Sequence, residues 1–543
     1  MPQDAIPTPT SLASGIRKDL TAHTGNLVVV GILILLGIGF RVSYLSEPVF
    51  WVDEVATVTR VSGYTRAEIV AELADGEGRS PQDLQRYQQV SGDRTWGNTL
   101  HALRGSPEHA PLYFLGARLW MQLFGSSVVA LRSFSVVLGL LLLPALYGFC
   151  RVLFPHPQVA LWTVGLAAVS PYLIAYSKEA RPYSLWALVL VAGSEMLAWA
   201  WQRQSWRAGL GYAASVALML YTSLLSAPVL LGQSVYAFIL SRGRFTPSFR
   251  HFLVTLGLGI LAFVPWVAVM VQQWGLLEDN TAWARSPLSL PIMVAVWLYS
   301  FAILIFDVPI APFPSLLGAL QGIMAAIVLG IMGWAVWALL RRTTFAQWGL
   351  LLALALPTPL VLILLDGLRG GQVSATSRYL FPTQIALIVV LGWFLTQRLE
   401  QRPRSTRWLI AGLLLLCLLS DGLGLGRSPN YQKARNIYNP AIAQVLNTAL
   451  NPLLIVPTDQ AFDALSLSHS LNDSVTLRFF PSEALAYAIP QPLAGESVFL
   501  LNPGELERDR LTQTLPIQLR EAYEPELLTE DDIYLALWQV VDR

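Results

Sequence analysis

An acidic pair, Asp53-Glu54, follows the first long apolar run of the sequence and stands just after Trp51. A carboxylate at a membrane surface, within hydrogen-bond reach of a hydroxyl, can take that hydroxyl's proton and act as a general base. The pair also fits a helix start, where Asp is a common N-cap and Glu is favourable in the first turn. Asp53 is therefore a candidate base with Glu54 as its partner, and helix capping is the alternative.

The segment Tyr-Ser-Lys-Glu-Ala-Arg-Pro-Tyr, residues 176–183, is a compact charged cluster between two apolar runs. Pro182 disfavours the helical conformation at Arg181, which indicates that the guanidinium is held at a turn. Lys178 and Arg181 could bind a phosphate through charge-assisted hydrogen bonds, with Glu179 orienting them or an acceptor. The alternative is a turn whose charges neutralise one another.

Three further cations lie at the ends of apolar runs. His109 stands just before Pro111, which fits the start of a helix, where backbone N–H groups attract anions. Arg378-Tyr379 opens a late apolar run, and Arg41 lies near the end of the first. Each is a candidate phosphate contact. The alternatives are a solvated loop histidine and arginines that anchor their helices at the membrane interface.

The composition indicates what kind of scaffold must position these residues. Of the 543 residues, 54% are hydrophobic and only 13% are charged, and the mean hydropathy is +0.51, which is typical of an integral membrane protein. The net charge of +1 gives no support for nucleic-acid binding. Only Cys150 and Cys417 are present, and both lie in apolar runs, so the sequence favours neither a disulfide framework nor a thiolate metal site.

Eleven apolar runs are read as membrane spans. The arginine-rich loops between them fall on one side if the N-terminus is cytoplasmic, as the positive-inside rule requires. Residues 1–25 then form a disordered cytoplasmic tail, and the apolar run 291–306 must be re-entrant or interfacial. The spans are residues 26–45, 129–152, 159–176, 183–201, 208–222, 227–240, 252–274, 316–340, 348–365, 379–396 and 408–425.

Two polar regions lie outside the membrane under this topology. The loop at residues 46–128 carries the acidic pair, and its apolar stretch 112–124 is too short to cross a bilayer, so we expect it along the interface. The tail, residues 427–543, has β-like runs at 453–457, 475–480, 498–501 and 533–541 and a helix-like stretch at 504–515. The sequence therefore predicts an α-helical polytopic membrane domain, residues 26–426, and a small external α/β domain.

The order of the motifs resembles the GT-C superfamily of polytopic glycosyltransferases, in the branch of protein O-mannosyltransferases and lipid A aminoarabinose transferases. The acidic pair matches the family's Asp-Glu motif, and His-Ala-Pro-Leu-Tyr at residues 109–113 matches a basic residue followed by Pro-Pro-Leu-Tyr. Ala110 replaces a proline, and Lys178 replaces the usual Gln. The resemblance covers residues 26–400, and its further matches are Phe124-Gly125, Leu131-Arg132, Ser170-Pro171, residues 176–183, and Arg378-Tyr379 with Pro382.

The resemblance implies a GT-C-like fold and a glycosyltransferase. Such an enzyme would move a sugar from a polyprenyl-phosphate donor to an acceptor hydroxyl by single displacement on the outer face of a bacterial plasma membrane. The acceptor, a glycan, lipid or protein, stays open. The implied catalytic residues are Asp53, Glu54 and Glu179. The implied binding residues for the lipid phosphate are Arg41, His109, Lys178, Arg181, Tyr183, Arg378 and Tyr379.

The resemblance predicts no metal ligands and no obligatory cofactor, because positioned cations can stabilise a leaving lipid monophosphate; a divalent cation remains an alternative. Two other classes of function stay open. One is a transporter or lipid flippase, although the spans carry few internal charges and show no matched halves with broken helices. The other is a non-catalytic GT-C-like membrane protein, against which the intact Asp53, Glu54 and Arg181 argue.

Overall fold

The computed structural model describes residues 24–285, 288–310, 315–428, 434–489, 497–523 and 535–542. Two compact units are formed from interleaved segments. The helical unit comprises Met1–Ser43, Ser106–Tyr113 and Arg132–Leu425, and the mixed unit comprises Tyr44–Gly105, Phe114–Leu131 and Gly426–Arg543. Residues 1–23 of the expected cytoplasmic tail, residues 1–25, lie outside the described residues.

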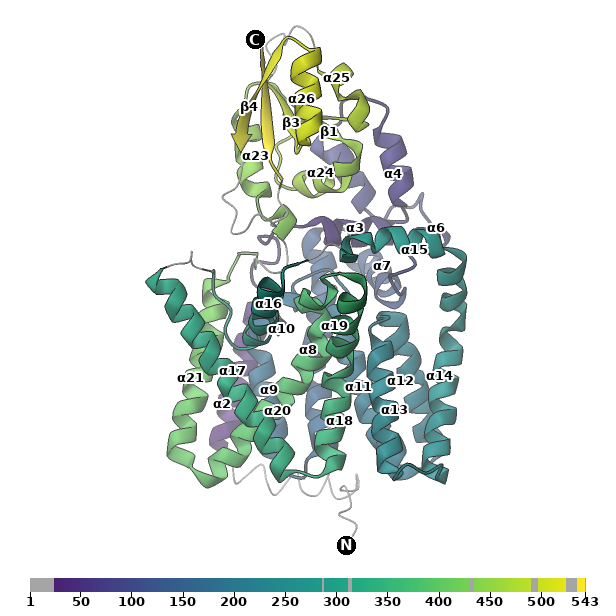
Figure 1. The fold of residues 1–543 in the computed structure, drawn as a ribbon, viewed down its shortest axis with the longest axis vertical. Helices are drawn as coiled ribbons and strands as arrows, with labels where there is room; N and C mark the ends of the chain where they lie inside the picture. The colour runs from purple at the N-terminus through teal and green to yellow at the C-terminus, as the bar shows by residue number, and fades with distance from the viewer. Residues whose placement is uncertain are drawn as a thin grey trace. The chain divides into compact units, whose positions relative to one another are not determined.

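The helical unit is a bundle of long apolar helices that run beside one another (Figure 1). Helix α20 (Phe381–Gln401) forms its centre: nearly every residue from Phe381 to Thr396 is buried, and α20 packs on α9, α17, α18 and α21. The other helices are α2 (Thr24–Val42), α8 (Val128–Leu153), α9 (Pro157–Ala168), α10 (Pro171–Ser177), α11 (Tyr183–Arg203), α12 (Trp206–Thr222), α13 (Ser226–Leu240), α14 (Pro247–Gln272), α15 (Trp274–Asn280), α16 (Leu290–Ala302), α17 (Leu316–Arg342), α18 (Phe345–Ala355), α19 (Pro357–Arg369) and α21 (Pro403–Leu423).

Each of the eleven expected spans coincides with a helix or a helix pair. Eight helical segments among the described residues are long and apolar enough to cross a membrane, and the pair α9 and α10, bent by 60°, makes a ninth if it is one span. Helices α12 and α13, with 17 and 15 residues, account for the difference from eleven. Helix α16 has 13 residues, about 20 Å, and is too short to span, as expected for the run 291–306.

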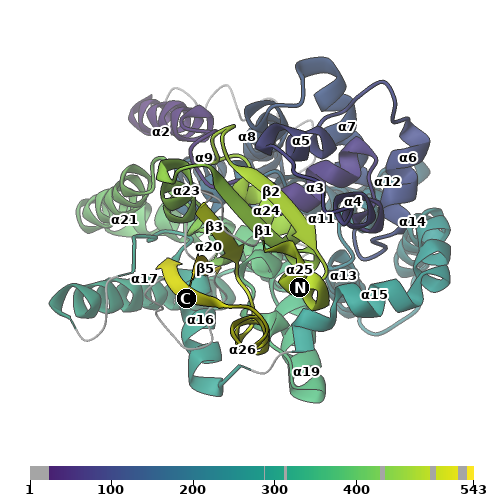
Figure 2. The same ribbon diagram turned by 90° about the horizontal axis from the view of Figure 1, so that it is seen from above.

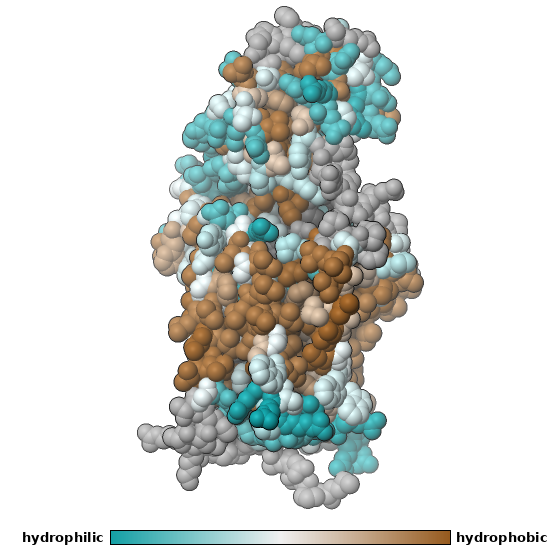
Figure 3. All heavy atoms as spheres, turned by 90° about the vertical axis from the view of Figure 1, so that its left-hand side faces the viewer, coloured by the Kyte–Doolittle hydropathy of each residue, from teal (hydrophilic) through white to brown (hydrophobic). Residues whose placement is uncertain are grey.

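One face of the helical unit carries a broad apolar surface. Figure 3 shows a band of hydrophobic residues over the bundle, with hydrophilic residues at its lower end. On α17 this surface includes exposed Leu320, Ile323 and Ile327, and on α21 it includes Leu415 and Leu419. Such an extent of exposed apolar side chains is what contact with lipid requires. The chain is therefore an integral, multi-pass membrane protein.

The mixed unit contains a five-stranded sheet with strand order β2-β1-β3-β5-β4. Figure 2 shows β2, β1, β3 and β5 of this sheet. Strand β1 (Pro452–Pro457) pairs in parallel with β2 (Thr476–Phe480) and β3 (Ser497–Leu501), and β5 (Leu537–Asp542) is antiparallel to β3 and to β4 (Ile517–Tyr523). All six residues of β1 are buried, so both faces of the sheet are covered. One face packs on α25 (Leu485–Ala488) and α26 (Glu505–Thr514) through Leu485 and Leu511.

The sheet confirms three expected strands and the expected helix at 504–515. The fourth expected strand, 533–541, begins at Leu537, and its residues 533 and 534 lie outside the described part of the chain. Strand β4 and the helices α23 (Asn439–Thr448) and α24 (Ala461–Leu467) were not expected from the sequence.

The loop after the first helix folds together with the tail in the mixed unit. It forms α3 (Val52–Ser62), α4 (Arg66–Leu73), α5 (Pro81–Gln85), the short 3-10 helix η1 (Arg86–Gln88), α6 (Trp96–Arg104) and α7 (Leu112–Phe124), the last with the expected bounds. Arg79 exchanges two backbone hydrogen bonds of 2.8 Å with Leu477 on the edge strand β2. Helix α24 of the tail packs against α3. The polar loop and the tail therefore fold as one unit.

Candidate active site

The acidic pair lies in the first turn of α3. Trp51, not Asp53, occupies the N-cap position, and its side chain makes no capping hydrogen bond. The alternative that Asp53 caps the helix is therefore wrong, although both acids still interact favourably with the helix N-terminus. Glu54 is fully buried, whereas Asp53 is partly exposed. Asp53 therefore lies inside the first turn of α3, and part of its side chain is exposed.

The other end of α3 is fixed by a residue that the sequence analysis missed. The carbonyl oxygen of Val61 accepts hydrogen bonds from Arg118 Nη1 at 2.8 Å and from Thr99 Oγ1 at 2.9 Å. Gly63 closes the helix with a φ of 92°. Arg118 is 1% exposed, and burial lowers the pKa of its guanidinium. An arginine in the middle of the apolar stretch 112–124 was the only signal for this role.

The turn that joins α10 to α11 is buried rather than solvated. Glu179, Arg181 and Tyr183 are 1%, 6% and 5% exposed, and Lys178 is partly exposed at the C-cap of α10. The N–H of Arg181 donates to the carbonyl oxygen of Glu179 at 2.8 Å, which keeps the turn tight. A solvent-exposed turn would carry no cost for its charges, whereas these buried charges need fixed partners or a ligand.

An aromatic cluster joins this turn to the segment that carries Arg378. Phe381, the first residue of α20, lies 4.8 Å from Tyr172, 5.1 Å from Tyr176 and 5.9 Å from Tyr183, measured between ring centroids. Tyr172 donates its hydroxyl to the carbonyl oxygen of Ser377 at 2.9 Å.

Charged side chains from both segments lie around this cluster. Both Tyr172 and Tyr176 interact electrostatically with Glu179 and with Arg378. Arg378 and Tyr379 lie in the 3-10 helix η4 (Ser377–Leu380), with the guanidinium 5.6 Å from the centre of the Tyr379 ring. The structure therefore brings Glu179, Arg181 and Tyr183 together with Arg378 around one cluster, whose members Tyr172, Tyr176 and Phe381 were missed from the sequence.

Arg41 lies at the break between α9 and α10. Its guanidinium is 1% exposed and donates to the carbonyl oxygens of Ala167 (3.1 Å) and Ala168, the last two residues of α9. These carbonyls have no partner within a helix that ends there, so Arg41 satisfies them. Its place as a phosphate contact stays a prediction, and the observed bonds give it a structural role.

A buried acid lies near two of the predicted cations. Asp421, near the end of α21, interacts electrostatically with Arg41, Lys178 and Asp307. The backbone N–H of Asp307 donates to Ser420 Oγ at 2.9 Å. An aspartate inside an apolar helix is a functional candidate by default, and that signal was present in the sequence.

His109 belongs to the short segment Ser106–Tyr113 of the helical unit. Trp266 donates through Nε1 to the carbonyl oxygen of Pro107 at 3.3 Å, and Asn280 donates to the carboxylate of Glu108 at 3.1 Å. His109 Nε2 lies 3.6 Å from Glu108 Oε1. Its side chain is 24% exposed, so it is neither a solvated loop histidine nor a core residue. Helices α14 and α15 thus hold the segment that carries it.

Two observations bear on metals and redox chemistry. Cys150 and Cys417 are free and buried. Across the part of the chain that the structure describes, no three His, Cys, Asp or Glu side chains are grouped to hold a metal ion.

The acidic pair belongs to the mixed unit, and the predicted phosphate-binding residues belong to the helical unit.

Comparisons with known proteins agree with the resemblance found in the sequence. Residues 108–269 match the family model of the dolichyl-phosphate-mannose-protein mannosyltransferases. This segment includes His109, Lys178, Glu179, Arg181 and Tyr183. The match confirms the resemblance to GT-C membrane glycosyltransferases over these residues. No curated protein sequence matches the chain.

Solved structures of low sequence identity were also found. ArnT from Cupriavidus metallidurans, bound to undecaprenyl phosphate, has 13% identity and a TM-score of 0.49, over 95% of this chain and 98% of that one. The Archaeoglobus fulgidus oligosaccharyltransferase, in complex with Zn and sulfate, has 12% identity and a TM-score of 0.43, over 87% of this chain and 67% of that one.

Proposed function

We propose that this chain, whose residues 108–269 resemble the dolichyl-phosphate-mannose-protein mannosyltransferases, is a membrane glycosyltransferase that takes its sugar from a polyprenyl-phosphate carrier. The observation that carries the proposal is the gathering of Arg181 and Arg378 around one aromatic cluster at the ends of membrane helices: the Arg181 guanidinium lies 5.9 Å from the centre of the Tyr183 ring, and Arg378 interacts with Tyr176. The phosphate of a membrane lipid lies at the membrane surface, where membrane helices end. A buried guanidinium favours a ligand of opposite charge.

The reaction follows from these groups as a single displacement. The acceptor hydroxyl oxygen attacks the anomeric carbon of the donor, and the bond from that carbon to the phosphate oxygen breaks. Asp53 takes the hydroxyl proton, and Glu54 orients Asp53 or the acceptor. Arg181, Arg378, Lys178 and His109 stabilise the phosphate that leaves on its lipid. These cations supply the charge that a metal would otherwise provide, so we expect transfer to persist in EDTA.

The proposed site faces the outside of a bacterial plasma membrane. The arginine-rich loops support this sidedness, because the positive-inside rule places them in the cytoplasm. It is tested with single cysteines in a background where the two buried native cysteines are replaced. Leu506 in the mixed unit is 82% exposed, and Ser405 in the first turn of α21 is also exposed. We expect a membrane-impermeant thiol reagent to label Leu506→Cys in intact cells and Ser405→Cys only after permeabilisation; the opposite pattern contradicts the proposed face.

Sugar transfer by the purified full chain tests the function itself. The protein is placed in vesicles with a radiolabelled polyprenyl-phosphate sugar and a membrane extract as the source of acceptors. We expect labelled acceptor to form with wild type and not with Asp53→Asn. If the protein moved the labelled lipid between leaflets without forming any labelled acceptor, it would be a flippase and the proposal would be wrong.

A further inference from the structure

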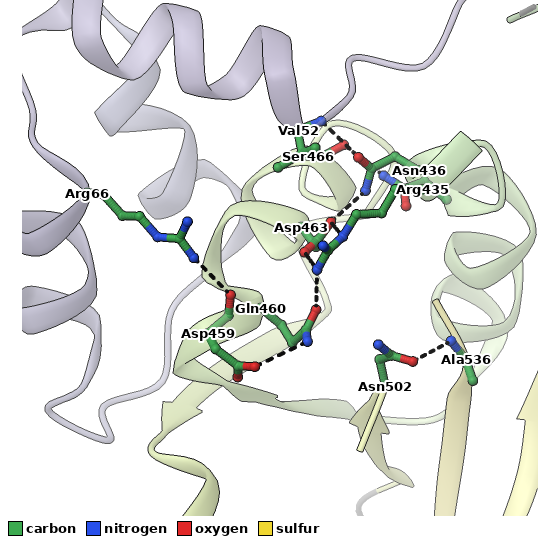
Figure 4. Close-up of polar contacts among 11 residues, drawn as sticks. Val52, Arg66, Arg435, Asn436, Asp459, Gln460, Asp463, Ser466, Asn502 and Ala536 are labelled. Atoms are coloured by element: carbon green, nitrogen blue, oxygen red, sulfur yellow. Dashed lines mark hydrogen bonds and ion pairs between the residues drawn. The ribbon is translucent and has the colours of Figure 1, made fainter. Parts of the chain in front are cut away.

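The helix that carries the candidate base is capped from a distant part of the sequence. The side chain of the N-cap residue Trp51 makes no capping hydrogen bond, and the first backbone N–H groups of a helix have no partner within the helix. The N–H of Val52, the first residue of α3, donates instead to Asn436 Oδ1 at 2.8 Å (Figure 4). Asn436 stands 384 residues further along the chain, in the tail. A tail residue therefore accepts the first N–H of α3, in the place of a side chain at the N-cap position.

Asp463 determines which way the Asn436 amide points. Asn436 Nδ2 donates to Asp463 Oδ1 at 3.0 Å, so the amide oxygen faces Val52. Asp463 is 2% exposed and accepts two more hydrogen bonds, from Arg435 Nε at 2.9 Å and Arg435 Nη2 at 2.7 Å. Gln460 accepts a further bond from Arg435 at 2.9 Å, as Figure 4 shows. The capping amide is thus fixed by a bidentate ion pair rather than left to rotate.

A second set of contacts holds the residue before the cap. Ser466 Oγ donates to the carbonyl oxygen of Phe50 at 2.6 Å, and Asn439 Nδ2 donates to Ser466 Oγ at 2.9 Å. The Phe50 ring packs edge-on against His469 with 4.9 Å between ring centroids. The backbone is therefore bound by tail residues on both sides of Trp51. Asp53 follows the bound amide directly, so the direction of its side chain depends on these contacts.

We propose that the C-terminal tail is a positioning domain for the acidic pair, in which Asn436, oriented by Asp463, fixes the N-terminus of α3 and with it the direction of Asp53. The inference rests on the function proposed above. A catalytic group must be held within about 0.5 Å of its productive place, and a displacement of about 1 Å can cost a hundredfold in rate. Asn436 and Asp463 are positioning residues, because they act through the backbone of α3.

The first test compares two asparagine variants of the full-length protein. Asn436→Ala removes the cap of α3, and we expect kcat per folded molecule to fall by about ten- to a hundredfold, with the donor KM changed by less than about twofold because the cations are untouched. Asn502→Ala is the control: Asn502 Oδ1 accepts from the N–H of Ala536 at 3.3 Å in the same tail (Figure 4), and because its φ is 47°, alanine there also adds backbone strain, which makes the control the stricter one. It removes a comparable bond away from α3, so we expect its kcat to match wild type.

A charge exchange provides the rescue. Asn436→Asp alone sets two carboxylates side by side, and we expect it to lower kcat at least as much as Asn436→Ala. Adding Asp463→Asn restores one carboxylate and one amide in exchanged positions, so a carboxylate oxygen again faces Val52. We expect the double variant to recover kcat several-fold over Asn436→Asp, which is the coupling of two residues in contact.

Hydrogen exchange separates this inference from the proposed function. We expect the amides of residues 52–54 to exchange faster in Asn436→Ala and not in Asn502→Ala. A wild-type kcat in Asn436→Ala would overturn the inference, and so would an equal loss of kcat in both variants, because that would be a general effect on folding. If wild type itself transferred no sugar, the proposed function would be wrong. The exchange rates would still decide whether Asn436 holds α3, and unchanged exchange of residues 52–54 in Asn436→Ala would overturn the positioning role of the tail.

Discussion

The cationic and the acidic candidate residues are held in different ways. Three of the cations, Lys178, Arg181 and Arg378, lie in two short connections of the helical unit, residues 178–182 and 377–380. The aromatic side chains beside them come from the adjoining helices: Tyr176 and Tyr183 flank the first connection, and Phe381 follows the second. The acidic pair of the mixed unit lies on a helix whose ends are bound by side chains far away in sequence, Asn436 at one end and Arg118 at the other.

This difference separates two kinds of sensitivity. Substitution of a cation should change only its own contact with the donor, because the adjoining membrane helices fix the backbone of the turn. The direction of Asp53 depends on contacts that join the loop to the tail, so changes in the tail should reach it through the backbone. Variants of the cations should therefore change donor binding, whereas variants around α3 should change the rate of the chemical step.

The largest expected effect is the loss of the base itself. Asp53→Asn keeps the size of the side chain, and because Trp51 occupies the N-cap, no cap is lost. We expect sugar transfer to fall by on the order of a hundredfold or more, measured per folded molecule in purified membranes.

Glu72→Gln is the control for Asp53→Asn, because Glu72 is an exposed acid of the same loop that forms a surface ion pair with Arg86. We expect it to transfer sugar at the wild-type rate. Near-normal transfer by Asp53→Asn would move the search for the base to Glu54 and Glu179.

The cationic side of the comparison predicts a smaller effect on a different quantity. Arg181→Ala and Arg378→Ala each remove a charge-assisted contact to phosphate, worth about 1.5–3 kcal/mol, so donor affinity should fall by roughly ten- to a hundredfold. Arg203→Ala at the opposite end of α11 is the control: Arg203 is exposed and lies 5.1 Å from the Trp199 ring centre, so donor binding should not change. Binding of a polyprenyl phosphate to the purified variants measures the difference, and wild-type affinity in both would reduce the two arginines to interfacial anchors.

The cationic turn could be predicted from sequence because its signal is local. Residues 176–183 carry the charges, the proline and the tyrosines within eight positions, and the structure keeps them together. Most expected spans and three strands were found for the same reason, since hydrophobic periodicity needs only neighbouring residues. Strand β4, with the pattern Ile-Gln-Leu-Arg-Glu-Ala-Tyr, was missed because it is half exposed and polar.

The support of α3 could not be predicted, because nothing local indicates it. Asn436 and Asp463 are ordinary polar residues in sequence, and their role appears only when the tail folds against the loop. The capping interpretation of Asp53 failed for a related reason, because a propensity says only which residue is a good N-cap. With Asp53 as the N-cap, α3 would begin at Glu54; it begins two residues earlier, at Val52 after the buried Trp51.

The C-terminal end of α3 offers a prediction of moderate size. Gly63 has a φ of 92°, and an added Cβ would lie 3.0 Å from Asn98 Cβ. Gly63→Ala should therefore destabilise α3 by about 1–2 kcal/mol, measured as the free energy of local opening by native-state hydrogen exchange. Gly92→Ala, in the same loop, is the control, because its Cβ would meet no atom within 4 Å. Equal effects of the two substitutions would contradict the role of Gly63 as the helix stop.

The smallest expected effect concerns helices of the same loop that, unlike α3, are capped by their own neighbours. In α5, the N–H of Ser80 donates to Asp83 Oδ2 at 2.9 Å, and the N–H of Asp83 donates to Ser80 Oγ at 3.2 Å. Hydrogen bonds from the backbone and the hydroxyl of Ser80 hold the pKa of Asp83 below its usual value. A carboxyl with a lowered pKa in the folded state contributes stability that is complete above its ordinary pKa, near 3.9, and is lost as the pH falls below it.

We therefore expect the α5 amides to lose protection from hydrogen exchange between pH 5 and pH 3, after correction for the intrinsic rate. The loss should stay below about fivefold, because Asp83 is exposed and water screens it. Asp83→Asn keeps the acceptor oxygen but has no proton to gain, so its α5 protection should not change over this range. Helix α11, with no acid in its first turn, is the internal reference. An equal loss in Asp83→Asn would mean that acid opens the whole loop rather than this cap.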